Sequence, residues 1–144
     1  MIELLQHTDE HIAEQALVTL RNMSVNVDNE VKIVLAGALT PLITLLRSPK
    51  PSMQEQACGA LRNLSVNAEN KVKIVQEGGL PPLIALLRSP LETIQEQAAV
   101  AVRNISVNPE YDVKIVQEGA LAPLVAMLSS TNEVIQEQVT LSLV

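Results

Sequence analysis

Amide side chains recur at one fixed interval along this chain. They belong to asparagines spaced 41 residues apart and to the glutamines seven residues before them, namely Asn22, Asn63, Asn104, Gln15, Gln56 and Gln97. On an α-helix, residues seven apart lie within about 20° of each other around the axis, so each pair would face one direction. Because a side-chain amide both donates and accepts hydrogen bonds, it can pair with the N–H and C=O of a peptide without reading the peptide's side chains. These amides are therefore candidate peptide-binding residues.

Small and apolar residues share this stripe. They lie four residues before each asparagine, at Val18, Gly59 and Val100, and three residues after it, at Val25, Val66 and Val107. An asparagine on such a stripe points away from the packed face of its helix, which favours a peptide-binding groove. The alternative to a groove is that each asparagine holds its own helix end or a neighbouring loop, and that each glutamine bonds to the next helix. The glycine in mid-helix indicates either the close approach of a ligand or neighbour, or sequence drift.

Charged residues form two further rows beside the stripe. An arginine directly precedes each asparagine and a glutamate directly precedes each glutamine, at Arg21, Arg62, Arg103, Glu14, Glu55, Glu96 and Glu137. On a helical wheel the arginines lie about 100° from the asparagines and the glutamates about 80°, on the same side. We favour arginine–glutamate pairs between adjacent repeats, because each charge then has a partner. The alternative is that the arginines bind an acidic group or a C-terminal carboxylate through paired hydrogen bonds.

Residue patterns typical of enzymes and metal sites are missing. His7 and His11 lie four residues apart, but no third histidine or cysteine is near, so we expect no zinc site. The single Cys58 is expected to be a small core residue and excludes an internal disulfide. The Gly78-Gly79 turn lacks the lysine and the serine or threonine of a phosphate-binding loop. We therefore expect neither catalysis nor a bound cofactor.

Composition restricts the partners further. The formal net charge of −6 disfavours nucleic acid, whose affinity comes from lysine and arginine neutralising phosphates, so basic or neutral partners fit better. Apolar residues make up 47% of the chain with Tyr111 as the one aromatic residue, which suits closely packed helices. No apolar run approaches the ~18 to 20 residues that span a bilayer, so membrane insertion is not expected. We expect a soluble protein of the cytoplasm or the nucleus.

The 41-residue period predicts how the chain positions these side chains. A self-similar period near 40 residues indicates a solenoid of stacked repeats. We divide the single domain 1–144 into a partial repeat 1–26, two whole repeats 27–67 and 68–108, and a truncated repeat 109–144. Each repeat is expected to contain a short helix that ends at a glycine, a second helix with proline in its first turn, and a longer third helix that carries the amide stripe. Ser52 with Glu55, and Thr93 with Glu96, are expected to form capping boxes at the third helices.

Three helices per unit, a glycine between the first and second, and the ALRNLS segment in the third resemble the armadillo repeat family over essentially the whole chain. The resemblance extends to beta-catenin-like and importin-alpha-like proteins and to fungal vacuolar and plant members. HEAT repeats, which usually pair two helices, are a weaker match. The resemblance implies an all-α, right-handed superhelix whose third helices line a concave groove for extended peptides. It assigns contacts with the peptide backbone to Asn22, Asn63 and Asn104.

One departure from the family pattern affects the choice of ligand. Importin-alpha-like proteins carry tryptophan four residues before the asparagine, where this chain has Val18, Gly59 and Val100. Aliphatic groups offer no cation–π attraction, so recognition of nuclear import signals is not implied.

Two functions follow from these patterns. The first is a protein–protein interaction scaffold that holds an extended segment of a partner protein. The second is a structural fragment of a longer array that associates with itself, as a weak homodimer through one end face. Apolar residues near the ends are expected to be exposed there, namely Met1, Ile2, Leu4, Leu5, Val139, Leu141, Leu143 and Val144.

Overall fold

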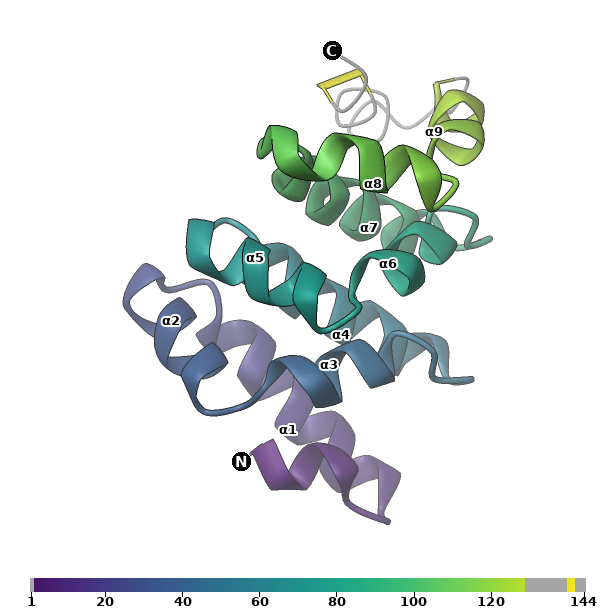
Figure 1. Ribbon diagram of the computed structural model, residues 1–144. Helices are drawn as coiled ribbons and strands as arrows, with labels where there is room; N and C mark the ends of the chain where they lie inside the picture. Colours follow the sequence, from purple (N-terminus) through teal and green to yellow (C-terminus); the bar gives the residue numbers. More distant parts are fainter. Residues whose placement is uncertain (1, 129–139, 142–144) are drawn as a thin grey trace.

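The computed structural model describes residues 2–128 and 140–141 of the chain. Within these ranges the protein consists of α-helices and short 3-10 helices and contains no strand (Figure 1). The elements in chain order are η1 (Ile2–Gln6), α1 (Glu10–Met23), α2 (Val27–Leu35), α3 (Leu39–Leu45), α4 (Pro51–Leu64), α5 (Ala68–Gln76), α6 (Leu80–Leu86), α7 (Glu92–Ser106), η2 (Pro109–Tyr111), α8 (Asp112–Gln117) and α9 (Leu121–Met127). The predicted all-α solenoid is confirmed.

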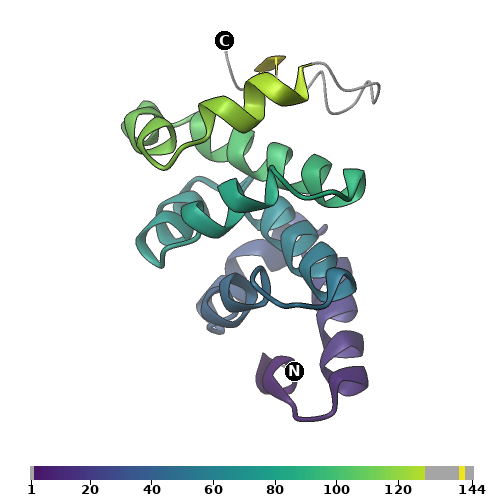
Figure 2. The same cartoon turned by 90° about the vertical axis from the view of Figure 1, so that its right-hand side faces the viewer.

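The repeats stack in chain order from the N-terminal to the C-terminal end of the molecule (Figure 2). Helices α2, α3 and α4 form one unit, and α5, α6 and α7 form the next. The third helices are in contact, because α4 packs against both α1 and α7. Each second helix packs on the third helix of its own unit, α3 on α4 and α6 on α7. One continuous row of third helices therefore runs through the stack.

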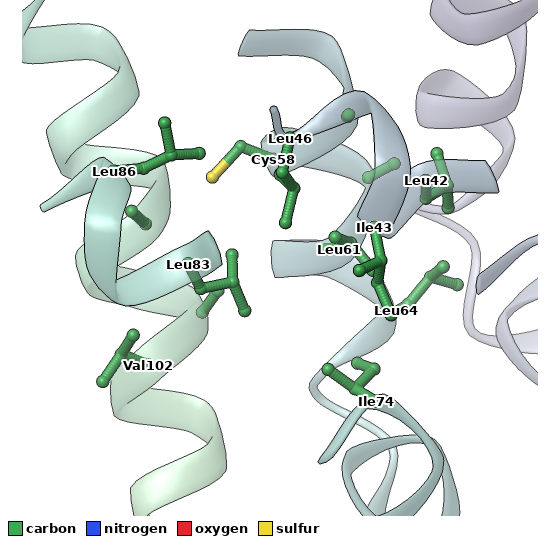
Figure 3. Close-up of a cluster of buried hydrophobic side chains, with 14 of the residues drawn as sticks. Leu42, Ile43, Leu46, Cys58, Leu61, Leu64, Ile74, Leu83, Leu86 and Val102 are labelled. Atoms are coloured by element: carbon green, nitrogen blue, oxygen red, sulfur yellow. The ribbon is translucent and has the colours of Figure 1, made fainter. Parts of the chain in front are cut away.

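The core between these helices is built almost entirely from aliphatic side chains. Figure 3 shows part of it, where Cys58 lies among leucines, isoleucines and valine from α3, α4, α5, α6 and α7. Cys58 is fully buried, as expected, and burial raises the pKa of its thiol to about 12. None of the helices in the described part of the chain is both long and apolar enough to cross a membrane.

Glycine ends the first helix of each unit, as the sequence predicts. Gly37, Gly78 and Gly119 have φ values of 90°, 81° and 89°, in the left-handed region that favours glycine. In the third of these units Pro109 begins a 3-10 turn, η2, and the α-helical part of the first helix begins only at Asp112.

The predicted capping boxes are wrong. Helix α4 begins at Pro51 and α7 at Glu92, so Ser52 and Thr93 lie inside the first turn instead of preceding it. The residues that do precede these helices make no side-chain capping bond, and among the described residues the buried Ser52 Oγ makes no hydrogen bond to the backbone of its helix. The preceding loops are held by glutamines instead, since Gln54 Nε2 donates to the carbonyl oxygen of Ser48 at 2.7 Å.

The apolar residues expected to be exposed near the ends divide into three groups. Leu4 and Leu141 are exposed, whereas Leu5 is buried and Ile2 is partly buried. Met1, Val139, Leu143 and Val144 lie outside the described residues.

Candidate functional site

The three third helices carry the predicted amide stripe, and its exposure falls from α1 to α7. Asn22 and Gln15 of α1 are exposed, and their counterparts in α4 are half-buried. In α7, Asn104 is 7% exposed and Gln97 is 9% exposed. The residues four before each asparagine follow a similar order, since Val18 is half-buried and both Gly59 and Val100 are buried.

The asparagines of α4 and α7 bond to the preceding third helix. Asn63 Nδ2 donates to Ser24 Oγ at 3.0 Å, and Asn104 Nδ2 donates to Ser65 Oγ at 3.1 Å. Both serines are fully buried, and each hydroxyl donates to the carbonyl oxygen of the arginine three residues before it. These bonds join consecutive repeats, which is the neighbouring-element role left open by the sequence.

The amides are not fully occupied by these contacts. Asn104 Oδ1 accepts a bond from Arg103 Nη2 at 2.9 Å, whereas Asn63 Oδ1 has no hydrogen-bond partner in the described part of the chain. An amide nitrogen carries two hydrogens and its oxygen can accept two bonds. Asn63 therefore retains both a donor and an acceptor, and the side chain of exposed Asn22 has no recorded bond at all.

Two of the arginines bond to glutamines of the following repeat, whereas the corresponding glutamine for Arg103, Gln138, lies outside the described residues. Arg21 Nη1 donates to Gln56 Oε1 at 3.0 Å, and Arg62 Nη1 donates to Gln97 Oε1 at the same distance. The favoured arginine–glutamate pairing is not found among residues 2–128, while Glu137 lies outside the described residues. Neighbouring residues on a helix point about 100° apart, so one position decides whether glutamine or glutamate faces the arginine.

The Arg21 side chain also accounts for Gly59. A Cβ atom added at Gly59 would lie 2.5 Å from Cζ and 2.9 Å from Nη2 of Arg21. Close approach and sequence drift were the two explanations left open for this mid-helix glycine, and the structure shows a close approach made by a neighbouring side chain. In the next repeat, Arg62 makes the equivalent glutamine bond although Val100 stands at the position of Gly59, so a side chain at this position is compatible with the same bond.

One glutamate of the predicted row has a different cation as partner. Lys50 Nζ lies 3.1 Å from Glu14 Oε2 and 3.8 Å from Glu10 Oε2. The hydrogen bond from Lys50 lowers the pKa of Glu14, and Glu14 in turn raises the pKa of Lys50. Glu55 and Glu96 are half-buried and have no ion-pair partner among the described residues.

Sequence reasoning missed two sets of polar residues in the same motif. The serines Ser24, Ser65 and Ser106 bond to the carbonyl oxygens of the preceding arginines. The asparagines Asn26, Asn67 and Asn108 accept backbone N–H bonds at the start of the next first helix. The signal was present, because both sets recur at the same 41-residue interval as the amide stripe.

Two further features bear on the chemistry of this site, the candidate metal ligands and one surface hollow near the amide stripe. Among the described residues, no group of three or more histidine, cysteine, aspartate or glutamate side chains is placed to hold a metal ion. His7 Nδ1 instead accepts the backbone N–H of Asp9 at 3.0 Å. An open hollow of about 530 Å³ lies on α1 beside Gln15, lined also by Ile12 and Thr19.

Comparison with solved structures identifies several similar helical arrays. An engineered protein is 32% identical with a TM-score of 0.91, and the match covers 99% of this chain and 59% of that protein. A computationally designed armadillo repeat protein for modular peptide recognition is 30% identical with a TM-score of 0.94, covering 98% of this chain and 60% of that one. A designed armadillo repeat protein in complex with the peptide (KR)4 is 30% identical with a TM-score of 0.92, over the same shares. The chain thus spans about 60% of the length of these structures.

The sequence also matches a family model. The model, described as an armadillo/beta-catenin-like repeat, matches residues 26–66, 67–107 and 108–143. No curated protein matches the chain. The three matches together cover most of the sequence, and the first two coincide with the stacked helical units α2–α4 and α5–α7. The chain belongs to the armadillo repeat family.

Proposed function

We propose that this protein is an interaction scaffold that holds an extended segment of a partner protein along α1, α4 and α7. The observation that carries the proposal is the unused hydrogen-bonding capacity of Asn22 and Asn63 on adjacent, contacting third helices. Packed helices lie ~8 to 10 Å apart and an extended strand rises ~3.3 Å per residue, so one repeat corresponds to roughly two to three peptide residues. A row of amides at that spacing suits a continuous backbone.

The remaining stripe residues have supporting roles in this proposal. Gln15 has no side-chain hydrogen bond to another described residue and offers its amide to the ligand, whereas Gln56 and Gln97 use their oxygens to hold arginines and keep their N–H groups for the ligand. Val18 and Val100 line the floor of the groove. Arg21 and Arg62 join consecutive repeats through their glutamine bonds, and Arg103 bonds to Asn104. Each guanidinium retains N–H groups beyond these bonds that can reach a carboxylate of the ligand.

The net charge and one relative favour a basic or neutral partner segment. The chain has a formal charge of −6, which opposes acidic ligands and nucleic acid. One designed armadillo protein of similar structure is solved in complex with a (KR)4 peptide. We place the interaction in the cytoplasm or the nucleus, because the single, buried Cys58 needs no oxidising compartment.

A second candidate function is association through an end face, and a specific exposure difference favours it. Leu121 and Val125 of α9 are 46% and 57% exposed, whereas their counterparts Leu80 and Ile84 in α6 are 0% and 2% exposed. In this alternative the apolar edge of α9 packs against a second copy of the chain, as a weak homodimer. Sedimentation at rising concentration tests it, because a strict monomer into the hundred-micromolar range would exclude that dimer.

A peptide-library screen against the purified chain tests the primary proposal. The best peptide is then titrated against the wild type, Asn63→Ala and the control Gln76→Ala, an exposed amide at the end of α5 outside the stripe. Asn63→Ala should weaken binding by about 1 to 3 kcal/mol, the cost of leaving a peptide group unpaired. Unchanged affinity in Asn63→Ala, or an equal loss in Gln76→Ala, would reject the groove.

A further inference from the structure

The turn after each third helix exposes one valine. Val25, Val66 and Val107 are 70%, 60% and 70% exposed. Each lies between a serine bonded to the preceding helix and an asparagine that caps the next first helix. These flanking bonds fix the backbone of the turn, so the valine cannot fold inward to escape water. Single exposed valines are common, but three at the same place in successive repeats form a row.

An acidic residue follows each of these valines by three positions. The residues are Asp28, Glu69 and Glu110, all exposed, and no hydrogen bond or ion pair of their carboxylates is recorded in the described part of the chain. Three residues of chain span at most ~10 Å, so each carboxylate lies within reach of one long side chain that also covers the valine. Carboxylates in the first turn stabilise their helices, which accounts for the acidic residues but not for the valines.

These six residues form what we call the ledge. The turns that carry it lie on one side of the solenoid, the left side in Figure 1, where each third helix passes into the next first helix. Each valine comes three residues after the stripe asparagine of its own repeat. The ledge therefore borders the proposed groove along its length.

We propose that the ledge binds lysine or arginine side chains of the segment held in the groove, which rests on the function proposed above. Long cationic side chains lay their methylene stems on apolar surface and keep the charged group in a polar site. In each repeat the valine takes the stem and the carboxylate takes the cation. An aliphatic or aromatic side chain fits less well, because it would remove water from the carboxylate without replacing its hydrogen bonds. The expected ligand carries one basic residue in every two or three.

Fluorescence anisotropy with three labelled peptides tests this proposal. The peptides alternate serine with lysine, with acetyl-lysine or with norleucine. All three of these side chains have an aliphatic stem, and only lysine carries a charge. The protein variants remove either half of the ledge, and a third set removes the same charge elsewhere on the exposed surface. They are V25S/V66S/V107S, D28N/E69Q/E110Q and the control E3Q/E92Q/E118Q.

The wild type should bind the lysine peptide more tightly than either neutral peptide. Because an exposed ion pair is worth up to ~1 kcal/mol, removing the three ledge carboxylates should weaken binding of the lysine peptide by about fivefold or more. Removing the three control carboxylates should weaken it by much less. The valine variant should weaken binding of lysine and acetyl-lysine peptides alike. Circular dichroism confirms that each variant is folded.

Each of the following results would overturn the ledge. Equal loss in the ledge and control charge variants would mean that only net charge matters, and tighter binding of norleucine than of lysine would mean an apolar occupant. If both ledge variants bind the lysine peptide like the wild type while Asn63→Ala binds it more weakly, the ledge is wrong and the groove remains. If the wild type binds none of the three peptides but a library peptide binds and responds to Asn63→Ala, the ledge alone fails; if no peptide binds at all, both proposals fail.

Discussion

Replacing the stripe asparagines by alanine, one at a time, should change the stability of the protein to a graded extent. Asn104 is 7% exposed and makes three recorded bonds, two from Nδ2 and one to Oδ1. Asn63 makes one bond, to Ser24, and the side chain of Asn22 has none recorded. The same substitution at the same repeat position thus removes three bonds, one bond or none.

The magnitudes follow from these counts. A net hydrogen bond contributes about 0.5 to 1.5 kcal/mol, and a buried partner left unsatisfied costs about 1 to 3 kcal/mol. Alanine favours a helix over asparagine by up to about 0.7 kcal/mol, but this gain is common to all three sites and cancels when they are compared. Relative to Asn22→Ala, we expect a loss of about 1 kcal/mol for Asn63→Ala and about 2 to 3 kcal/mol for Asn104→Ala.

Denaturant unfolding followed by circular dichroism measures these differences. Helical signal should be equal in all three variants before unfolding, which confirms that each is folded. Equal losses at the three sites, or a greater loss at Asn22 than at Asn104, would refute the assignment of these asparagines as bonds between repeats.

Three further predictions concern single positions. Gly59→Ala should raise the free energy of unfolding by up to about 1 kcal/mol, because alanine favours the helix and the flexible Arg21 side chain can move aside; a loss of stability would show that Arg21 is held in place. Burial raises the pKa of Glu30, so the folded state binds this proton more tightly than the unfolded state does. The protein therefore loses stability as the pH rises from the unfolded-state pKa through the folded-state pKa of this group. Glu30→Gln should therefore raise the melting temperature at pH 7 and have less effect at pH 4; an equal shift at both pH values would contradict this. Cys58, with its thiol pKa raised to about 12, should resist alkylation at pH 8 in the folded protein and react on unfolding, and rapid labelling of the native chain would show that its surroundings open.

The fold was predictable because its signal is repeated. The 41-residue interval, the left-handed glycines at positions such as Gly37 and the aliphatic composition all indicate the same stacked helices. Each element is therefore supported by two or more copies of the same pattern, and local sequence and global packing agree.

The contacts between repeats were less predictable, because a helical wheel describes one helix at a time. It places Arg62 on one side of α4 but does not say which residue of α7 lies opposite, and that partner is Gln97 instead of its neighbour Glu96. The offset between stacked third helices likewise decides that Asn104 faces Ser65. These offsets depend on side-chain packing across the interface, which no single repeat encodes.

The capping box at Ser52 failed for a different reason. The spacing of Ser52 and Glu55 fits the pattern, but Pro51 fits the first helical position, and the helix begins there, two residues earlier than a cap at Ser52 would place it. Two local signals compete at this place, and the position of the proline prevails.

The most direct test of the proposed groove is to observe the side-chain amides themselves while a selected peptide binds. In a nitrogen-15 NMR titration with the best library peptide, the NH2 signals of Asn22 and Asn63 should shift together and saturate at one dissociation constant. The corresponding signals of Gln76, outside the stripe, should not move. Peptide binding that leaves the Asn22 and Asn63 amides unchanged and shifts only residues of α9, such as Leu121 and Val125, would contradict the groove and place recognition at the end face instead.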